Sequence, residues 1–211
     1  MLPAMVTQPT TDRGESTRRR ILDVAARHFL ERGFTGTSLN EVIRESGLTK
    51  GGFYFHFTGK SDLALEALEM VRSEWRGEVL AHAGYHPRAV DQIAALVRAA
   101  AVGKRTAPAG TAIGRLCQEL AQQPGMAERV RPFDAWFELT ADLFRRAQAE
   151  GDMDPAIDAE AAAHYAVCAF LGIDQVADVS GDPALVERLA EQYLIFTFAG
   201  VGITARVPAA H

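Results

Sequence analysis

The amino-acid sequence predicts an all-α protein of about nine helices, in which a small three-helix head precedes a larger helical body. Apolar residues recur three and four positions apart along most of the 211 residues, which is the spacing of a helix with one buried face. No stretch shows the sustained alternation that a half-buried strand requires. Glycine and proline clusters such as Gln123-Pro124-Gly125 and Gly181-Asp182-Pro183 divide the chain into segments of helical length.

The composition excludes several classes of protein. With 48% hydrophobic and 23% charged residues and no apolar run long enough to cross a bilayer, the chain is not expected to be a membrane protein. Its start lacks the apolar core of a signal peptide, so we expect a disordered arm over residues 1–14 and a cytoplasmic location. Cys117 and Cys168 each stand alone in a helical pattern, which favours buried, reduced thiols. No cofactor or metal site is predicted.

Charge is distributed unevenly along the chain. Residues 13–60 carry nine lysines and arginines against five acids, a net charge of +4, whereas residues 61–211 carry a net charge of −8. Asp12 completes the total of −5. A basic head on an acidic body is typical of a protein that binds a polyanion at one end, although a chance asymmetry of the surface is the alternative.

The first two helices of the head have recognisable ends. The first is predicted from about Ser16 to Arg32, with Gly33 as a left-handed cap and Phe34 folding back onto its apolar stripe. The second opens at Ser38, which forms an S-x-x-E capping box with Glu41.

A short third helix completes the head. Ser46-Gly47 ends the second helix, and Thr49 is placed to cap the third. Two short helices joined by a glycine-bearing turn predict a helix-turn-helix from Ser38 to Phe55. We therefore expect a DNA-binding domain over residues 15–57 and an effector-binding and dimerisation domain over residues 58–205.

The segment from Thr49 to Lys60 carries choices that are poor for stability. Gly51 and Gly52, in the first turn of a short helix, cost about 1 kcal/mol each against alanine but leave a bare backbone for close approach. Lys60 opposes a helix dipole that a phosphate would complement. Donors that suit a phosphate backbone lie in the same segment: Thr49, Lys50, Tyr54 and His56. Phe53 and Phe57 are interpreted as core residues.

These motifs resemble the TetR family of repressors from Arg18 to about Leu68. The matching pattern comprises Ile21-Leu22-Asp23-Val24-Ala25, Phe29, Gly33-Phe34, Thr37-Ser38, Val42-Ile43, Gly47-Leu48-Thr49-Lys50-Gly51, Phe53-Tyr54-Phe55-His56-Phe57, Lys60 and Leu63. The resemblance implies that the third helix enters the major groove with Lys50 and Gly51 near base edges. It also implies phosphate contacts by Thr37, Thr49, Tyr54, His56 and Lys60. Gly52 departs mildly from the pattern, since many members carry a small side chain there.

The body is similar to the γ-butyrolactone autoregulator receptors of that family. The similar residues are Trp136, Leu143, Ala147, Gly151 and the run Ala169-Phe170-Leu171-Gly172-Ile173-Asp174-Gln175. In those receptors a tryptophan at about this position lines the ligand cavity, which makes Trp136 the expected ligand contact. An ordinary core tryptophan is the alternative.

The last two predicted helices, at about 155–179 and 183–203, carry more apolar surface than one monomer can bury. Large side chains there alternate with small ones, as in Tyr165, Gly172, Val176, Tyr193, Phe196 and Gly200. This pattern predicts a two-fold homodimer in which the helices of two subunits pack together. The resemblance implies the same interface.

Together these features predict a ligand-responsive regulator, a repressor, that binds a palindromic DNA operator as a dimer and is released by a small-molecule effector. The alternatives are an effector-independent DNA-binding protein and an all-α enzyme. The enzyme has little support, because Gly59-Lys60-Ser61 lacks the other parts of a P-loop and the His82/His86 pair lacks the glutamate of a zinc protease.

Overall fold

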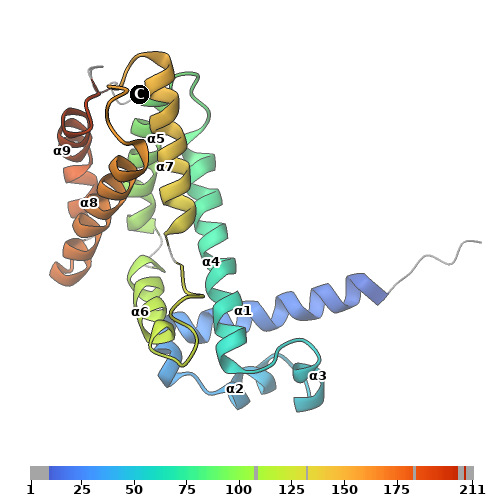
Figure 1. Cartoon of the computed structure of the whole chain (residues 1–211). Coiled ribbons are helices and arrows are strands. Elements are labelled where there is room, and N and C mark those ends of the chain that lie inside the picture. Colours follow the sequence, from blue (N-terminus) through green and yellow to red (C-terminus); the bar gives the residue numbers. More distant parts are fainter. Residues whose placement is uncertain (1–9, 107–108, 132, 183, 204–206, 208–211) are drawn as a thin grey trace, which may run out of the picture. The chain divides into compact units, whose positions relative to one another are not determined.

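The computed structural model describes residues 10–106, 109–131, 133–182, 184–203 and 207. Within these residues the chain forms nine α-helices and no strand, which confirms the predicted fold class (Figure 1). The helices are α1 (Thr10–Gly36), α2 (Leu39–Glu45), α3 (Lys50–Tyr54), α4 (Lys60–Ala83), α5 (Ala89–Thr106), α6 (Ala109–Ala121), α7 (Asp134–Glu150), α8 (Ala159–Ser180) and α9 (Ala184–Gly200). None of the described helices is long and apolar enough to cross a membrane.

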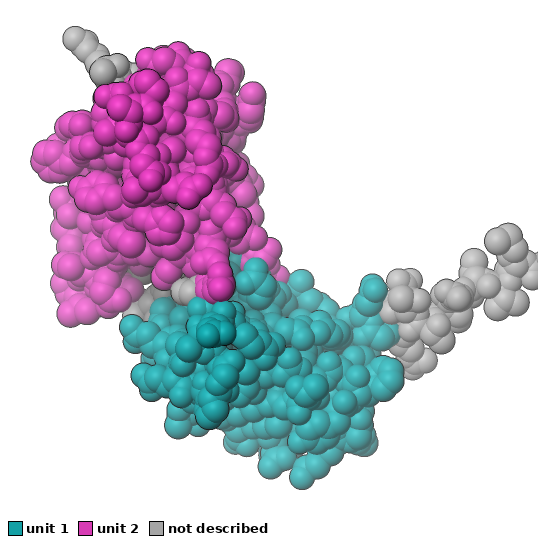
Figure 2. Space-filling view, in the orientation of Figure 1, with its two compact units in different colours: residues 1–72, 112–130 teal, residues 73–111, 131–211 magenta. Residues whose placement is uncertain are grey.

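The chain divides into two compact units (Figure 2). The first, called the head, comprises residues 1–72 and 112–130, and the second, called the body, comprises residues 73–111 and 131–211. The expected boundary near residue 58 therefore differs from the structure. Leu63 and Leu68 of α4, together with Leu116 and Leu120 of α6, are fully buried, so the head is completed by segments that follow the helix-turn-helix in the chain.

Helix α1 is longer than its sequence signals predict. It begins at Thr10, so residues 10–14, expected in a disordered arm, are helical, and residues 1–9 lie outside the described part of the chain. Residues 10–15 contain no proline, the preceding one being Pro9, so the helix can continue through them. At the other end Gly33 has φ +73°, and the rings of Phe29 and Phe34 stack 6.1 Å apart. The return of Phe34 is thus confirmed, whereas Gly33 has the expected positive φ but a ψ of 178°, so it forms a kink and not the predicted left-handed cap.

The turn between α2 and α3 follows the predicted chemistry. Gly47 has φ +68°, and the hydroxyl of Thr49 accepts a hydrogen bond of 3.2 Å from the backbone N–H of Gly52, which confirms the cap of α3. The capping box of α2 was predicted wrongly, because the Ser38 side chain makes no capping bond. Glu41 instead accepts a hydrogen bond of 2.8 Å from Arg32, and this ion pair draws the carboxylate away from the start of α2.

In the body, α5, α7, α8 and α9 pack around one apolar core. Helix α8 begins after Asp158, whose carboxylate accepts from the N–H groups of Glu160 and Ala161, and not at the predicted Asp154-Pro155. Tyr193 was expected at a subunit interface, but it is buried and its hydroxyl donates to the carbonyl of Ala166 at 2.8 Å. Cys168 is exposed, contrary to expectation, and the thiol buried in the head is that of Cys117.

Candidate DNA-binding surface

Helix α3 has a buried side and an exposed side. Phe53 and Phe57 are buried and stack with ring centroids 5.7 Å apart, which confirms that both belong to the core. Lys50 and Gly51 are exposed, and Tyr54 keeps 56% of its surface accessible. The two core rings thus anchor the short helix and hold its polar residues outward.

The glycines of α3 are not required by the fold. A Cβ added to Gly51 would meet nothing within 4 Å, and one added to Gly52 would make only ordinary contacts, the nearest at 3.5 Å to the Thr49 hydroxyl. Neither glycine has a positive φ. Since neither packing nor backbone conformation demands them, they fit the interpretation that another molecule approaches this backbone closely.

The other predicted contact residues differ in their accessibility. The exposed Thr49 uses its hydroxyl to accept from Gly52, and the partly exposed His56 lies edge-on to Phe55 at 5.2 Å. Thr37 is 3% exposed, and its hydroxyl donates to the carbonyls of His28 at 3.0 Å and Gly33 at 2.8 Å. The Thr37 hydroxyl therefore bonds inside the head and is not accessible to a DNA phosphate.

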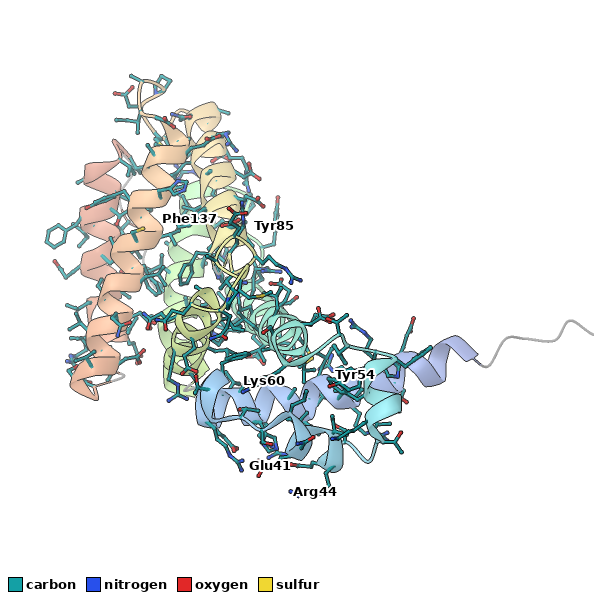
Figure 3. The ribbon with its side chains drawn as sticks, turned by 60° about the horizontal axis from the view of Figure 1, so that its bottom comes forward. Glu41, Arg44, Tyr54, Lys60, Tyr85 and Phe137 are labelled. Atoms are coloured by element: carbon teal, nitrogen blue, oxygen red, sulfur yellow. The ribbon has the colours of Figure 1, made fainter. Side chains whose placement is uncertain are left out.

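Lys60, for which the resemblance implies a phosphate contact, lies against an aromatic ring of the head. Its Nζ lies 4.5 Å from the centroid of the Phe34 ring, so the ammonium is in cation–π contact within the head. Burial lowers the pKa of Lys60, and the carboxylate of Glu119 acts in the opposite direction. Figure 3 shows Lys60 and Tyr54 at separate places on the head.

Sequence reasoning missed two exposed residues near this surface. Phe55 is 85% exposed, although it lies between the buried Phe53 and Phe57. The exposed Arg44 lies in the last turn of α2. Within the described part of the chain it forms no ion pair, and the same is true of Arg20 and Lys50. Other arginines of the head are paired with acids: Arg18 with Glu66, Arg19 with Asp23, Arg27 with Glu45 and Arg32 with Glu41. These ion pairs leave Arg20, Arg44 and Lys50 as cations of the head that no acid among the described residues neutralises.

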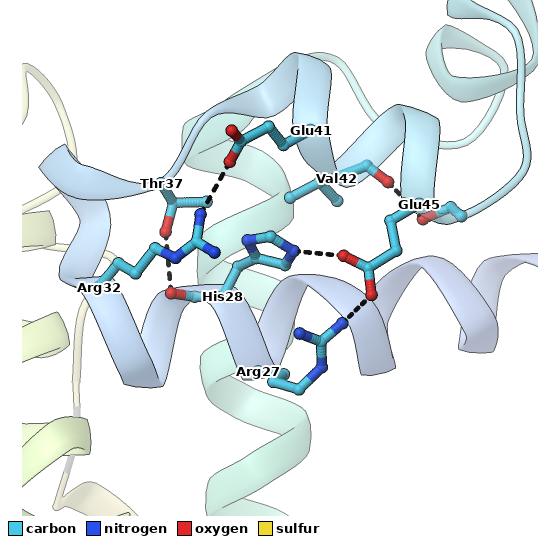
Figure 4. Close-up of polar contacts among 8 residues, drawn as sticks. Arg27, His28, Arg32, Thr37, Glu41, Val42 and Glu45 are labelled. Atoms are coloured by element: carbon cyan, nitrogen blue, oxygen red, sulfur yellow. Dashed lines mark hydrogen bonds and ion pairs between the residues drawn. The ribbon is translucent and has the colours of Figure 1, made fainter.

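A polar cluster joins α1 to α2 (Figure 4). Glu45 accepts a hydrogen bond from Arg27 and lies 2.7 Å from Nε2 of the buried His28. These contacts, that of His28 first, lower the pKa of Glu45. Since Glu45 is the last residue of α2, the cluster fixes the end of α2 from which the turn leads to α3. In the sequence this cluster is indicated only by the position of His28 within the apolar stripe of the first helix.

In the body, Trp136 is part of an aromatic pair. Its ring lies 5.4 Å from that of Trp75 at an interplanar angle of 66°, and both rings are partly buried against the apolar core. A Cβ added to Gly103 of α5 would lie 3.9 Å from Nε1 of Trp75. Residues from α4, α5 and α7 therefore meet around the predicted ligand contact, and Trp75 was not anticipated from the sequence.

Comparison with known proteins found relatives both for the helix-turn-helix segment and for most of the chain. A profile described as bacterial regulatory proteins, tetR family, matches residues 21–67, which include α2 and α3. AcrR, an HTH-type transcriptional regulator of Shigella flexneri, is 44% identical over 64 residues, which span 30% of this chain and 30% of that protein. This match therefore covers less than a third of AcrR.

Two further relatives match most of the chain. The A-factor receptor protein of Streptomyces griseus is 28% identical over 208 residues, covering 92% of this chain and 68% of that protein. The crystal structure of full-length TylP, a TetR regulator from Streptomyces fradiae, superposes with a TM-score of 0.69 and 29% identity, covering 91% of this chain and 89% of that chain. Residues 21–67, with the Thr49-capped α3, thus belong to the TetR family of bacterial regulatory proteins, and the whole all-helical chain is similar to members of that family.

Proposed function

We propose that this regulator is a cytoplasmic repressor that binds a palindromic DNA operator through α3 and is released by a small-molecule effector. The observation that carries the proposal is the division of α3, in which buried Phe53 and Phe57 hold Lys50, Gly51 and Tyr54 outward. A helix presented in this way fits the major groove, where a lysine can contact a guanine edge and hydroxyls can hold phosphates. The relatives matched are regulators, which leaves the enzyme alternative without support.

A second copy of the chain is the partner that best fits the exposed faces of α8 and α9. These helices leave large apolar side chains accessible beside small residues: Tyr165, Val176, Val179, Ile195 and Phe196, with Gly172 and Gly200. Two-fold packing of these faces would bury them in a four-helix interface. Two copies of α3 on successive major grooves are about 34 to 36 Å apart, so the operator would be roughly palindromic.

The proposed effector is a small, largely apolar molecule of the γ-butyrolactone type. The support is the aromatic pair of Trp75 and Trp136 and the name of the A-factor receptor among the relatives. An effector that favours one conformer of the body by about 1 to 3 kcal/mol would change operator affinity by roughly five- to 150-fold. An effector-independent DNA-binding protein would lack this coupling.

The DNA-binding part is tested by a gel shift on the DNA upstream of the protein's own gene. The wild type is expected to retard a specific fragment, and Lys50→Ala is expected to lose that preference. Arg76→Ala, which removes one positive charge from the body portion of α4, is the matched control and should bind normally. If Lys50→Ala and wild type retard every fragment alike, α3 does not select the operator.

The effector is tested by thermal melting with a panel of lactones, furans and aromatic compounds. A true effector stabilises the folded protein by RT ln(1 + [L]/Kd), so the melting temperature should rise with concentration. Trp136→Leu should weaken this rise, whereas Trp75→Leu tests whether the pair acts together. A panel without any shift would favour the effector-independent alternative.

A further inference from the structure

Helix α6 contacts the end of α1 through two side chains four residues apart. The guanidinium of Arg115 donates to the carbonyls of Leu30 at 2.7 Å and Glu31 at 3.4 Å. These carbonyls lie just before the kink at Gly33, where a cation complements unpaired helix carbonyls. All of these residues belong to the head, so this contact lies within one compact unit.

Glu119, the second of these side chains, rests on the kink itself. Its Oε2 accepts a hydrogen bond of 2.9 Å from the backbone N–H of Thr35. A Cβ at Gly33 would lie 2.5 Å from Oε1 of Glu119, so a larger residue would displace the carboxylate from this position. Gly33 therefore serves two purposes, because it supplies a positive φ of 73° and also permits this close approach.

Lys60 meets the same site from the start of α4. Its ammonium lies over the ring of Phe34, which stands between Gly33 and Thr35 in the chain. The negative charge of Glu119 acts on this ammonium, and burial already disfavours its charged form. Lys60 thus occupies an internal site on the aromatic face of Phe34, and the Glu119 carboxylate is bound to the backbone N–H of the next residue, Thr35.

We propose that Glu119 is a positioning residue that sets the affinity of the head for DNA, because it holds Lys60 in this internal site and away from a DNA phosphate. The inference rests on the proposed function, in which the head binds DNA. One ammonium cannot occupy both sites, and the flexible stem of lysine permits it to exchange between them. Each lysine that engages a phosphate releases counterions and steepens the salt dependence of binding. The negative charge of Glu119, fixed beside Phe34 by the hydrogen bond from Thr35, is therefore a brake on DNA binding.

Glu119→Gln separates the charge of this residue from its hydrogen bond. The amide oxygen can still accept from Thr35, but the attraction for Lys60 is lost. We expect tighter binding of duplex DNA at low salt, by about three- to tenfold, and a slope of log K against log salt that steepens by up to about one. In a Lys60→Ala background the same substitution should change nothing. Glu69→Gln, an equal charge change at an exposed position of α4, is the control.

Two results would overturn the inference: equal affinities of wild type and Glu119→Gln, or a gain that persists in the Lys60→Ala background. Because phosphate contacts do not depend on base sequence, the test uses a duplex of arbitrary sequence. Failure of the proposed function would instead appear as a lack of preference for the protein's own upstream DNA.

NMR spectroscopy of the free protein, followed by addition of the duplex, tests the internal site of Lys60 directly. The ε-methylene protons of Lys60 should be shifted upfield by the Phe34 ring in the free protein, and Phe34→Leu should remove this shift. Adding the duplex should reduce the shift in wild type. Lys60 resonances at their ordinary position in the free protein would also overturn the inference.

Discussion

Nε2 of the buried His28 lies 2.7 Å from Oε2 of Glu45, and this contact joins the middle of α1 to the last residue of α2. The carboxylate also accepts from Arg27, so two side chains of α1 hold one acid of α2. The position of α3 follows from this contact, because only Ser46 to Thr49 separate Glu45 from the start of that helix.

Glu45→Gln is expected to destabilise the head at neutral pH, because the contacts with His28 and Arg27 favour the charged carboxylate and lower its pKa below the ordinary value of 4.5. A group whose pKa is lower in the folded state contributes stability above its unfolded pKa and loses it as pH falls through the folded pKa. Urea unfolding at pH 7 and at acid pH should therefore show a difference between variant and wild type that shrinks below about pH 4.5. The exposed Glu31→Gln should show no such difference, and a gap that is constant with pH would contradict the prediction.

Phe55→Ala and Phe53→Ala should have opposite consequences although the two residues are close in sequence. Phe55 is 85% exposed, so its loss should leave folding stability unchanged and weaken operator binding by about 1 to 2 kcal/mol, roughly five- to thirtyfold in Kd. Phe53 is 0% exposed, so its loss should cost about 3 to 5 kcal/mol of folding free energy. Urea unfolding and fluorescence anisotropy with labelled operator separate these effects. Unchanged operator binding by Phe55→Ala would remove this ring from the DNA-binding surface.

Thr37→Val tests whether the hydroxyl of Thr37 acts inside the protein. The variant keeps the shape of the side chain but loses the one buried hydroxyl hydrogen, which the carbonyls of His28 and Gly33 share. We expect a loss of about 1 to 2 kcal/mol in the free energy of unfolding and an unchanged salt dependence of DNA binding. A weaker salt dependence of DNA binding together with an unchanged free energy of unfolding would instead show that Thr37 contacts a phosphate.

Phe196→Glu should convert the proposed dimer into monomers. The ring is 65% exposed in the single chain, and a carboxylate in its place would be buried without a partner in a two-fold interface. Sedimentation velocity would then show the monomer mass, and operator affinity would fall because each head binds alone. Leu80→Glu, at an exposed apolar position of α4, should leave the oligomeric state unchanged.

The elements that the sequence predicted well depend on neighbours in the chain. The Gly47 turn, the Thr49 cap and the Phe29–Phe34 stack each involve residues at most five positions apart, so their local chemistry is sufficient. The family pattern then identified the exposed residues of α3. Local signals also explain why the fold class was predictable, since helical spacing recurs in nearly every segment.

The predictions that differ from the structure involve competition from residues distant in sequence. Glu41 was expected to close a capping box, but Arg32 of α1 takes its carboxylate. Lys60 was expected to contact a phosphate, and in the structure its ammonium lies over Phe34, where the charge of Glu119, 59 residues further along the chain, acts on it. Hydroxyl direction is similarly invisible in sequence, as Thr37 illustrates. Such contacts depend on tertiary packing, which residue spacing alone does not reveal.

The discontinuous head has a consequence for protein engineering. Because residues 112–130 belong to the same compact unit as residues 1–72, exchanging only residues 1–57 with a relative would leave the new α1 facing a foreign α6. Arg115 and Glu119 would then meet a kink for which they were not selected. A chimaera that recombines operator preference from one family member with effector response from another should transplant both segments together.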